Sequence, residues 1–389
     1  MKFFTRVFFF CLCPVLWAQS NLTEIGELPL AVRETSGLIH YNNSLITHND
    51  SGNLPELYEI DKNTLEITRV VTVANAINTD WEDITQDDDY IYIGDIGNNN
   101  GNRTDLKILK IRKSDYDTSD TVTAEIISYA YEDQTSFISQ TNNNDFDAEA
   151  LLVIDDNLIV FTKQWVSLGT TAYSIPKLAG DHVAVNIGNY QVDGLITGST
   201  QNQANANEFY LVGYSEILFP FFVQFNFQDN TAIFSGDINT SSLNIGVAQV
   251  ESIAFNAEEN EFFISSEEFI SAPIIDTKAR LFSFSLDDNN EEEEEEENEN
   301  GEGEEEPSTI EEDVILVKSF GEAEIQFILN ENLNLLSLGI FDASGRLLLL
   351  ELEENIEDSI LPTDILSSGV YYATFIFEDR RISKAFLKE

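Results

Sequence analysis

One pattern recurs five times between residues 34 and 286, and it restricts the folds open to this chain. In each copy an acidic residue opens a short apolar run, a turn follows, and a second apolar run ends in polar side chains. Self-similarity at about 40–50 residues with several strands per unit is typical of a β-propeller. The pattern therefore predicts five blades, and the long second copy leaves a sixth blade open. The acids that open the copies are Glu34, Glu82, Glu149, Asp193 and Glu251.

Blade geometry predicts that these acids gather around one axis. Neighbouring strands of a blade run antiparallel, so the start of the first strand lies beside the end of the second, and the first strands surround the central channel. Carboxylates in one small volume repel each other unless a cation joins them or some take up protons. The expected pairs are Glu34 with His48 and Asp50, Glu82 with Asp95, Glu149 with Lys163, and Glu251 with Glu267.

Oxygen ligands without sulfur suit Ca²⁺ better than zinc or copper. We therefore predict a calcium site on the axial face. The alternative is that the acids only accept hydrogen bonds from backbone amides at the blade tops. The predicted metal ligands are Glu34, Glu82, Asp95, Glu149 and Glu251.

The axial face also offers candidate ligand-binding side chains. The loop from Asp95 to Arg103 is rich in Asn and Gly, the mixture that calcium loops use, although Asn-Gly turns often serve only the turn itself. Arg103 and Lys163 are cations that could hold a phosphate or carboxylate, or could merely neutralise neighbouring acids. Trp81 could stack on a small ligand, with packing between blades as the alternative.

Catalysis, if there is any, would depend on carboxylates and a metal ion. The sequence has no Gly-x-Ser-x-Gly, no phosphate loop and no His-Glu-x-x-His. The candidate catalytic residues are Glu82 and Asp95, which could also serve glycoside cleavage, and His48 as a general acid or base. Whether the protein is an enzyme stays open, with a metal-dependent hydrolase as the class of enzyme to consider.

The net charge excludes some partners. At −50 the chain would be repelled by nucleic acid, so no nucleic-acid partner is expected. We expect a monomer that binds a small polar or phosphorylated ligand. No apolar segment after the N-terminal one approaches the ~20 residues that span a bilayer, so the mature protein should have no membrane span.

The N-terminal segment reads as a signal peptide over residues 1–18. Lys2 and Arg6 precede an apolar run, and Ala18 stands at a plausible cleavage point. Both cysteines lie in this segment, so disulfides should be absent from the mature protein. The propeller is expected over 21–286, and its fifth copy has three strand runs only. Because propellers close by sharing a strand between the two ends of the chain, we predict that residues 21–32 complete that blade.

The C-terminal part divides into two pieces. Residues 287–313 contain an unbroken Glu run with Gly and Pro, a composition typical of a disordered linker because like charges repel. Residues 314–389 contain six short apolar runs separated by turns, which predicts a small Ig-like β-sandwich. The predicted fold class is thus all-β throughout, a propeller followed by a sandwich.

Two resemblances accompany these patterns. Asp80-Trp81-Glu82-Asp83-Ile84 and Ile93-Gly94-Asp95-Ile96-Gly97 resemble segments of phytase-like propellers, and the layout is similar to calcium-dependent nucleotidases; both imply a calcium-dependent phosphoesterase. The stretches 338–346, 364–372 and 384–388 resemble the C-terminal sorting domain of type IX secretion cargo of Bacteroidota. That resemblance implies the type IX secretion machinery as a partner and export through the periplasm to the outer-membrane surface or the medium.

Overall fold

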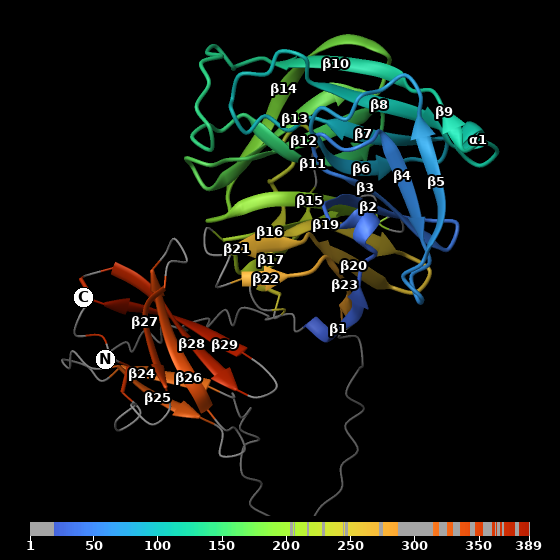
Figure 1. Ribbon diagram of the computed structural model, residues 1–389. Coiled ribbons are helices and arrows are strands. Elements are labelled where there is room, and N and C mark those ends of the chain that lie inside the picture. Colours follow the sequence, from blue (N-terminus) through green and yellow to red (C-terminus); the bar gives the residue numbers. More distant parts are fainter. Residues whose placement is uncertain are drawn as a thin grey trace, which may run out of the picture.

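The computed structural model of the protein consists of β-strands in almost every described segment (Figure 1). The predicted all-β fold class, a β-propeller and a sandwich, is confirmed. The predicted signal peptide and acidic linker lie outside the described residues. Those residues are 19–202, 205, 207–215, 218–227, 230–243, 245, 248–271, 275–286, 314–318, 325–329, 335–342, 347–352, 360–361, 363, 366–367, 369–377 and 381–388.

The propeller strands form five successive antiparallel units of four strands each. In the first unit, β2 and β3 are joined by Asn42 and Asn43, both with positive φ (47° and 63°), as a two-residue hairpin turn requires. The strands of units one and two are β2 (Thr35–Tyr41), β3 (Ser44–Asn49), β4 (Glu56–Ile60), β5 (Ile67–Val73), β6 (Trp81–Gln86), β7 (Tyr90–Asp95), β8 (Lys107–Arg112) and β10 (Glu125–Tyr131).

Units three to five repeat this order. Their innermost strands β11 and β19 are buried along their whole length, because each lies between neighbouring units as well as within its own sheet. The strands are β11 (Asp147–Ile154), β12 (Asn157–Lys163), β13 (Gly169–Pro176), β14 (Gly180–Gln191), β15 (Leu195–Gln201), β16 (Glu208–Tyr214), β17 (Pro220–Asn226), β18 (Asp237–Ser242), β19 (Val250–Asn256), β20 (Glu261–Ser266), β23 (Arg280–Leu286) and β1 (Gln19–Glu27).

The N-terminal strand closes the ring. β1 pairs antiparallel with β23, with Glu27 opposite Arg280. The prediction that the N-terminal segment completes the last blade is therefore confirmed, although the strand ends at Glu27 and the last part of the predicted range 21–32 is the 3-10 helix η1 (Leu30–Val32). The five innermost strands contact one another in the cyclic order β2, β6, β11, β15, β19 and back to β2. Closure leaves no exposed edge at the junction of the two ends.

Apolar clusters between neighbouring units hold the ring together. The cluster between the first two units contains Ile46, Leu57, Trp81 and Ile93, all fully buried. Each of the other four junctions has a corresponding cluster. Burial at about 25 cal/mol per Å² makes these clusters the main source of stability, so the polar residues at the ends of the strands are free to serve another purpose.

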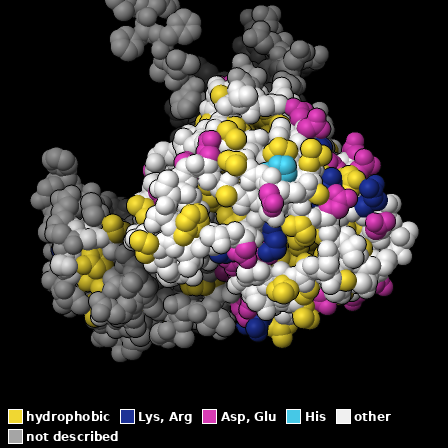
Figure 2. All heavy atoms as spheres, turned by 90° about the horizontal axis from the view of Figure 1, so that it is seen from above, with side chains coloured by type: hydrophobic (Ala, Val, Ile, Leu, Met, Phe, Trp, Pro, Cys, Tyr) yellow, Lys and Arg dark blue, Asp and Glu magenta, His cyan; other side chains and the backbone are white. Residues whose placement is uncertain are grey.

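Outer strands also join neighbouring units. β10 of the second unit pairs in parallel with β14 of the third, which merges two units into one eight-stranded sheet. β9 likewise pairs in parallel with β5. On the flank that carries β10 and β14, hydrophobic side chains are scattered among polar and charged ones (Figure 2). The smaller elements are η1 (Leu30–Val32), α1 (Lys113–Tyr116), β9 (Thr121–Val122), β21 (Phe269–Ser271) and β22 (Ile275–Thr277).

The C-terminal segment forms the predicted sandwich of two sheets. Ile325 and Phe327 from the smaller sheet share one apolar cluster with Leu338, Ile340 and Phe375 from the larger. No described helix is long and apolar enough to cross a membrane. The smaller sheet has β24 (Val314–Lys318) and β25 (Ile325–Leu329), and the larger has β27 (Leu347–Leu352), β26 (Leu335–Asp342), β28 (Gly369–Phe377) and β29 (Arg381–Lys388).

Candidate functional site

Every innermost strand of the propeller carries one extra residue near its start. The pairing with the second strand of the unit skips one position there, which is a β-bulge, and bulges re-aim side chains. The skipped residues are Gly37, Glu82, Glu149, Thr197 and Glu251. Three of the five are glutamates, and all three line one cavity on the axis.

The cavity has a volume of about 190 Å³ and opens at the ends where the innermost strands begin. Its lining combines acids from four units with one ammonium group, two aromatic rings and several amides. The lining residues are Ser36, Asp50, Glu82, Asn99, Asn142, Glu149, Lys163, Trp165, Tyr214, Gln249, Glu251 and Glu267.

Negative charge dominates this lining, with five carboxylates facing the single ammonium of Lys163. Glu82 and Glu251 are 5% and 7% exposed, and among the described residues neither carboxylate has a hydrogen-bond or ion-pair partner. Burial, reinforced by Asp50, raises the pKa of Glu82 well above its usual value. Burial likewise raises the pKa of Glu251 and, together with Asp50, that of Glu267 to about 7. The fold therefore holds carboxylates together without the protein groups that would neutralise them.

Asp50, Asp80 and Glu82 form the tightest group of acids. Their ligand oxygens all lie within 4.8 Å of one another. Two oxygens on opposite sides of a Ca²⁺ ion are about 5 Å apart, since each Ca–O distance is about 2.3–2.6 Å, so one calcium ion could contact all three. A Cβ atom added at Gly97 would lie 2.5 Å from an Asp80 oxygen and would also clash with Glu82. Any side chain at position 97 would therefore displace these two carboxylates, and glycine avoids this clash.

Glu149 is neutralised differently from Glu82. Both of its carboxylate oxygens lie 2.7 Å from the Nζ of Lys163, and both side chains are buried. The ammonium also lies 4.9 Å from the Trp165 ring centre and 5.3 Å from the Tyr214 ring centre. Lys163 thus faces the cavity as a fixed positive charge, with its charge shared between a carboxylate and two rings.

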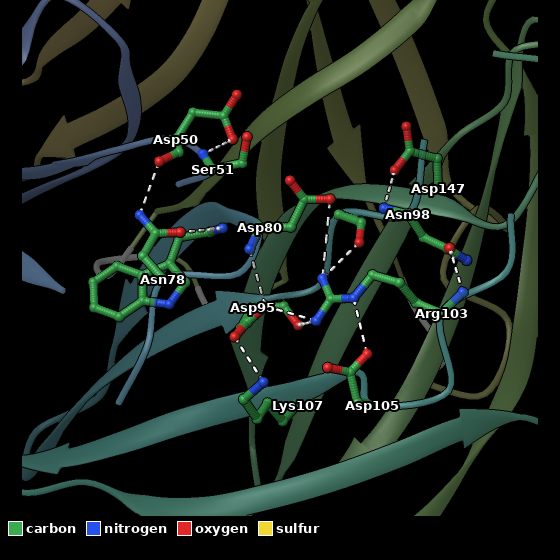
Figure 3. A network of polar contacts seen from close by, with 12 residues as sticks. Asp50, Ser51, Asn78, Asp80, Asp95, Asn98, Arg103, Asp105, Lys107 and Asp147 are labelled. Atoms are coloured by element: carbon green, nitrogen blue, oxygen red, sulfur yellow. Dashed lines mark hydrogen bonds and ion pairs between the residues drawn. The ribbon is translucent and has the colours of Figure 1, made fainter. Parts of the chain in front are cut away.

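Asp95 and Arg103 lie outside the cavity lining, which changes the roles predicted for them. Arg103 reaches Asp95 at 2.8 Å, Asp105 at 3.1 Å and the carbonyl of Gly97 at 2.7 Å, and Lys107 reaches the other Asp95 oxygen at 2.7 Å (Figure 3). Two cations therefore neutralise the fully buried Asp95, and Arg103 is engaged in fixing the loop that follows β7. We assign both residues to positioning, in place of metal and ligand binding.

The roles predicted for Trp81 and His48 are also revised. Trp81 is fully buried in the cluster between the first two units, so its ring cannot stack on a ligand. His48 is buried edge-on against Trp81, with ring centres 5.5 Å apart. Burial lowers its pKa to about 4, so it is a neutral core residue and has no access to the cavity as an acid or base.

Glu34 stands at the rim, three residues before the bulge of its strand. Its carboxylate accepts a hydrogen bond from the Nδ2 of Asn53 at 2.7 Å, and it does not line the cavity. Asp193, the acid that opens the fourth copy, also precedes its bulge by four residues. The five copies align at their bulged residues and not at the acids that open them. In the first and fourth copies, Gly37 and Thr197 occupy the position that a glutamate occupies in the other three.

Two acids of the site were missed by the sequence reasoning, and one clue to them was present. Asp80 and Asp147 each precede a bulged glutamate by two residues. Burial raises the pKa of Asp80 to about 7, with Asp50 contributing. Asp147 fixes the rim, because it accepts hydrogen bonds from the Asn98 amide at 2.5 Å and the Trp165 indole at 2.8 Å. The shared Asp-x-Glu spacing in copies two and three was the available signal.

Comparisons with known proteins identify no family for this chain. No protein-family model matches the chain, and no curated protein does. The solved structures to which it is similar include the crystal structure of the mitotic checkpoint complex, at 9% identity over 64% of this chain and 61% of that chain, with a TM-score of 0.31. Another is the crystal structure of the RRP9 WD40 repeats, at 6% identity over 67% and 97%, with a TM-score of 0.34. The match thus spans about three fifths of the first of these chains.

Proposed function

We propose that the protein is an exported β-propeller that binds one calcium ion and a polar ligand at the mouth of its axis. The observation that supports calcium most directly is the carboxylate of Glu82, which is buried, without a protein partner among the described residues, and grouped with Asp50 and Asp80. A buried carboxylate without a partner is costly, and a divalent cation would remove that cost. Carboxylate and carbonyl oxygens are the ligands that Ca²⁺ takes.

Thermal unfolding with and without calcium tests this proposal. A ligand that binds only the folded state at about 100 times its Kd stabilises by about 2.7 kcal/mol, so the melting temperature should rise clearly when calcium replaces a chelator. Glu82→Gln should abolish the rise. Asp88→Asn, an exposed acid at the opposite end of β6, should leave it intact. An equal response to calcium and chelator in the wild type would remove the proposed site.

A calcium-dependent phosphoesterase is the second candidate, and the one observation in its favour is the Lys163 ammonium beside the acid group. In that case Lys163 would hold the phosphate and the ion would polarise it. Generic phosphoesters assayed with calcium and with chelator decide between the two. Hydrolysis that the chelator abolishes and Glu82→Gln removes would favour the enzyme, and no hydrolysis of any substrate would favour the binding protein.

We also propose that residues 1–18 direct export and that the C-terminal sandwich is a type IX sorting domain. The support is the charged-then-apolar N-terminal sequence and the order of motifs in 338–388, carried by a compact β domain. Intact mass measurement of the protein recovered from the cell surface tests both parts. Loss of residues near 1–18 and of 314–389 is expected, and a full-length chain retained in the cytoplasm would contradict the proposal.

A further inference from the structure

We infer that the axial mouth is a docking surface for a polypeptide that inserts a lysine or arginine side chain flanked by apolar residues. This inference rests on the proposed function, since it names the polar ligand that shares the cavity with the ion. It draws on two features of the same face: negative charge in the cavity, and exposed apolar side chains in the loops at this end of the propeller.

The cavity has more acids than a calcium ion and Lys163 can neutralise. Its five carboxylates face one ammonium, so when all are ionised a divalent ion leaves two negative charges uncompensated. Burial raises the pKa of Glu251 and Glu267, and a cationic occupant beside them would favour their ionised forms. Asp50 and Glu82 belong to the calcium group, whereas Glu251 and Glu267 lie on the fifth unit. Glu251 is 7% exposed and has no hydrogen-bond or ion-pair partner among the described residues. A phosphate would meet repulsion from this side of the cavity, and a cationic group would be attracted.

The size of the cavity limits the occupant. Pockets for drug-sized molecules are about 300–1,000 Å³, and this one is about 190 Å³. It therefore accepts one side chain or a group of a few atoms. Two rings, Trp165 and Tyr214, line it beside the acids, and the Lys163 ammonium already lies against both. The groups that would attract an occupant are therefore the carboxylates of Glu251 and Glu267. An ammonium or guanidinium group fits both the volume and the chemistry.

Six exposed apolar side chains lie in the loops at this same end of the propeller. These loops follow β1, β3, β5, β10 and β12, the strands that end at the mouth. The residues, with their exposed fractions, are Leu30 at 73%, Leu54 at 66%, Ile77 at 77%, Phe137 at 44%, Ile138 at 74% and Val166 at 59%. We call this set the apolar rim. Exposed apolar groups around a polar centre are typical of protein interaction sites.

Hydrogen bonds hold the rim loops in place. On the first unit, Asn78 donates to the carbonyls of Asn49 and Asp50, and Asn49 donates to the carbonyl of Ala31. These bonds tie together the loops that carry Leu30, Leu54 and Ile77.

The other side of the rim is fixed in the same way. Asp145 accepts a hydrogen bond from the Val166 amide at 3.0 Å, and the amide of Gln140 donates to the carbonyl of Asn100 at 2.8 Å. A surface held ready in this way loses little entropy on binding. The occupant is a polypeptide because a basic side chain and apolar flanks on both sides of it are needed at once.

Pools of short peptides test the inference on the full mature chain in calcium. The pools are fluorescent heptapeptides with Lys, Arg, Gln or Glu fixed at the centre and flanks drawn from Leu, Phe, Val, Ile and Ser, measured by fluorescence polarisation. We expect the Lys and Arg pools to bind at least tenfold more tightly than the Gln pool, and the Glu pool not to bind. Equal binding of all four pools, or best binding by the Glu pool, would overturn the inference.

Variants locate the binding on the mouth. Glu251→Gln with Glu267→Gln should remove the preference for Lys over Gln. Phe137→Ser with Ile138→Ser, both exposed, should weaken the Lys pool severalfold in a chain that folds normally. Leu178→Ser, an exposed apolar residue that follows β13 at the opposite end, should change nothing. Every variant keeps the acidic tract 287–313, so any general attraction of this tract for basic peptides is the same in the wild type and the variants. If both mouth variants bind the Lys pool as tightly as the wild type, the proposed docking site is refuted.

The experiments can refute the calcium proposal and the docking proposal independently of each other. If calcium gives no thermal stabilisation but the Lys pool still binds at the mouth, the calcium proposal is refuted and the docking proposal is supported. If calcium stabilises and the four pools bind alike, the docking surface is wrong.

Discussion

Replacing Asp80 by Asn should make the calcium-free protein more stable, which is the reverse of what most substitutions at a largely buried site do. The Asp80 side chain is 18% exposed, and its nearest cation, Arg103, lies 3.9 Å away. Burial raises its pKa to about 7, with Asp50 and Asp147 adding repulsion. The folded state therefore holds the ionised form at a disadvantage that Asn does not share.

The sign and size of the expected change in stability follow from the difference between the pKa of Asp80 in the folded and in the unfolded chain. Below about pH 3.8 the acid is protonated in both states and contributes nothing. As the pH rises toward 7, only the unfolded chain ionises, so the stability of the wild type falls. Above 7 the full difference applies, about 4 kcal/mol for a pKa raised from 3.8 to about 7. Screening by the water that reaches the carboxylate reduces this to about 2 kcal/mol.

The assay is thermal unfolding in chelator at pH 8 and pH 4.5. Asp80→Asn should melt about 4–8 °C above the wild type at pH 8, since 1 kcal/mol corresponds to about 2–4 °C in a domain of this size, and most of that gain should disappear at pH 4.5. Adding calcium at pH 8 should stabilise the wild type more than the variant. A variant no more stable than the wild type at pH 8, or a gain independent of pH, would refute the reasoning.

Three further substitutions test the parts of the site separately. Lys163→Met leaves Glu149 buried without its cation and should lower the free energy of unfolding by about 3–5 kcal/mol in urea titrations, with partial recovery when Glu149→Gln is added. Gly97→Ala should push the neighbouring carboxylates apart and reduce the calcium-dependent rise in melting temperature, while the melting temperature in chelator changes little. Arg103→Met removes one of the two cations on Asp95 and should destabilise by about 3 kcal/mol in urea titrations, and a loss below 0.5 kcal/mol would show that Lys107 alone is sufficient.

The sequence was sufficient to predict the repeat, the closure by the N-terminal strand and the convergence of acids, because each depends on local pattern and strand direction. β1 pairs with β23 as expected, and Glu149 faces Lys163 as antiparallel pairing requires. The phase of the repeat could not be found in this way. A bulge shifts every later residue of the strand by one position relative to its partner, and nothing in the fourth copy marks Thr197 in place of Asp193.

The sequence also could not predict which carboxylates form ion pairs with cations of the protein. Asp95 and Glu82 are both acids near the ends of paired strands, and no pattern distinguishes them. The structure separates them because Arg103 folds back over Asp95 while Glu82 keeps its carboxylate toward the axis. Which carboxylate a cation reaches depends on the path of a nine-residue loop, and that path is decided by tertiary hydrogen bonds such as Asn98 to Asp147.

The bulges also explain how a ring of acids can coexist with a stable fold. A bulged residue is left out of the ladder, so its side chain can turn to the axis while the strand on either side stays paired. The next residue shows the complementary solution: the carboxylate of Asp83 turns inward and accepts hydrogen bonds from the Leu151 amide at 2.7 Å and the Ser199 hydroxyl at 3.0 Å, linking three units. One acid therefore ties the ring together because its hydrogen bonds are satisfied, and its neighbour Glu82 is available to a ligand because its own are not.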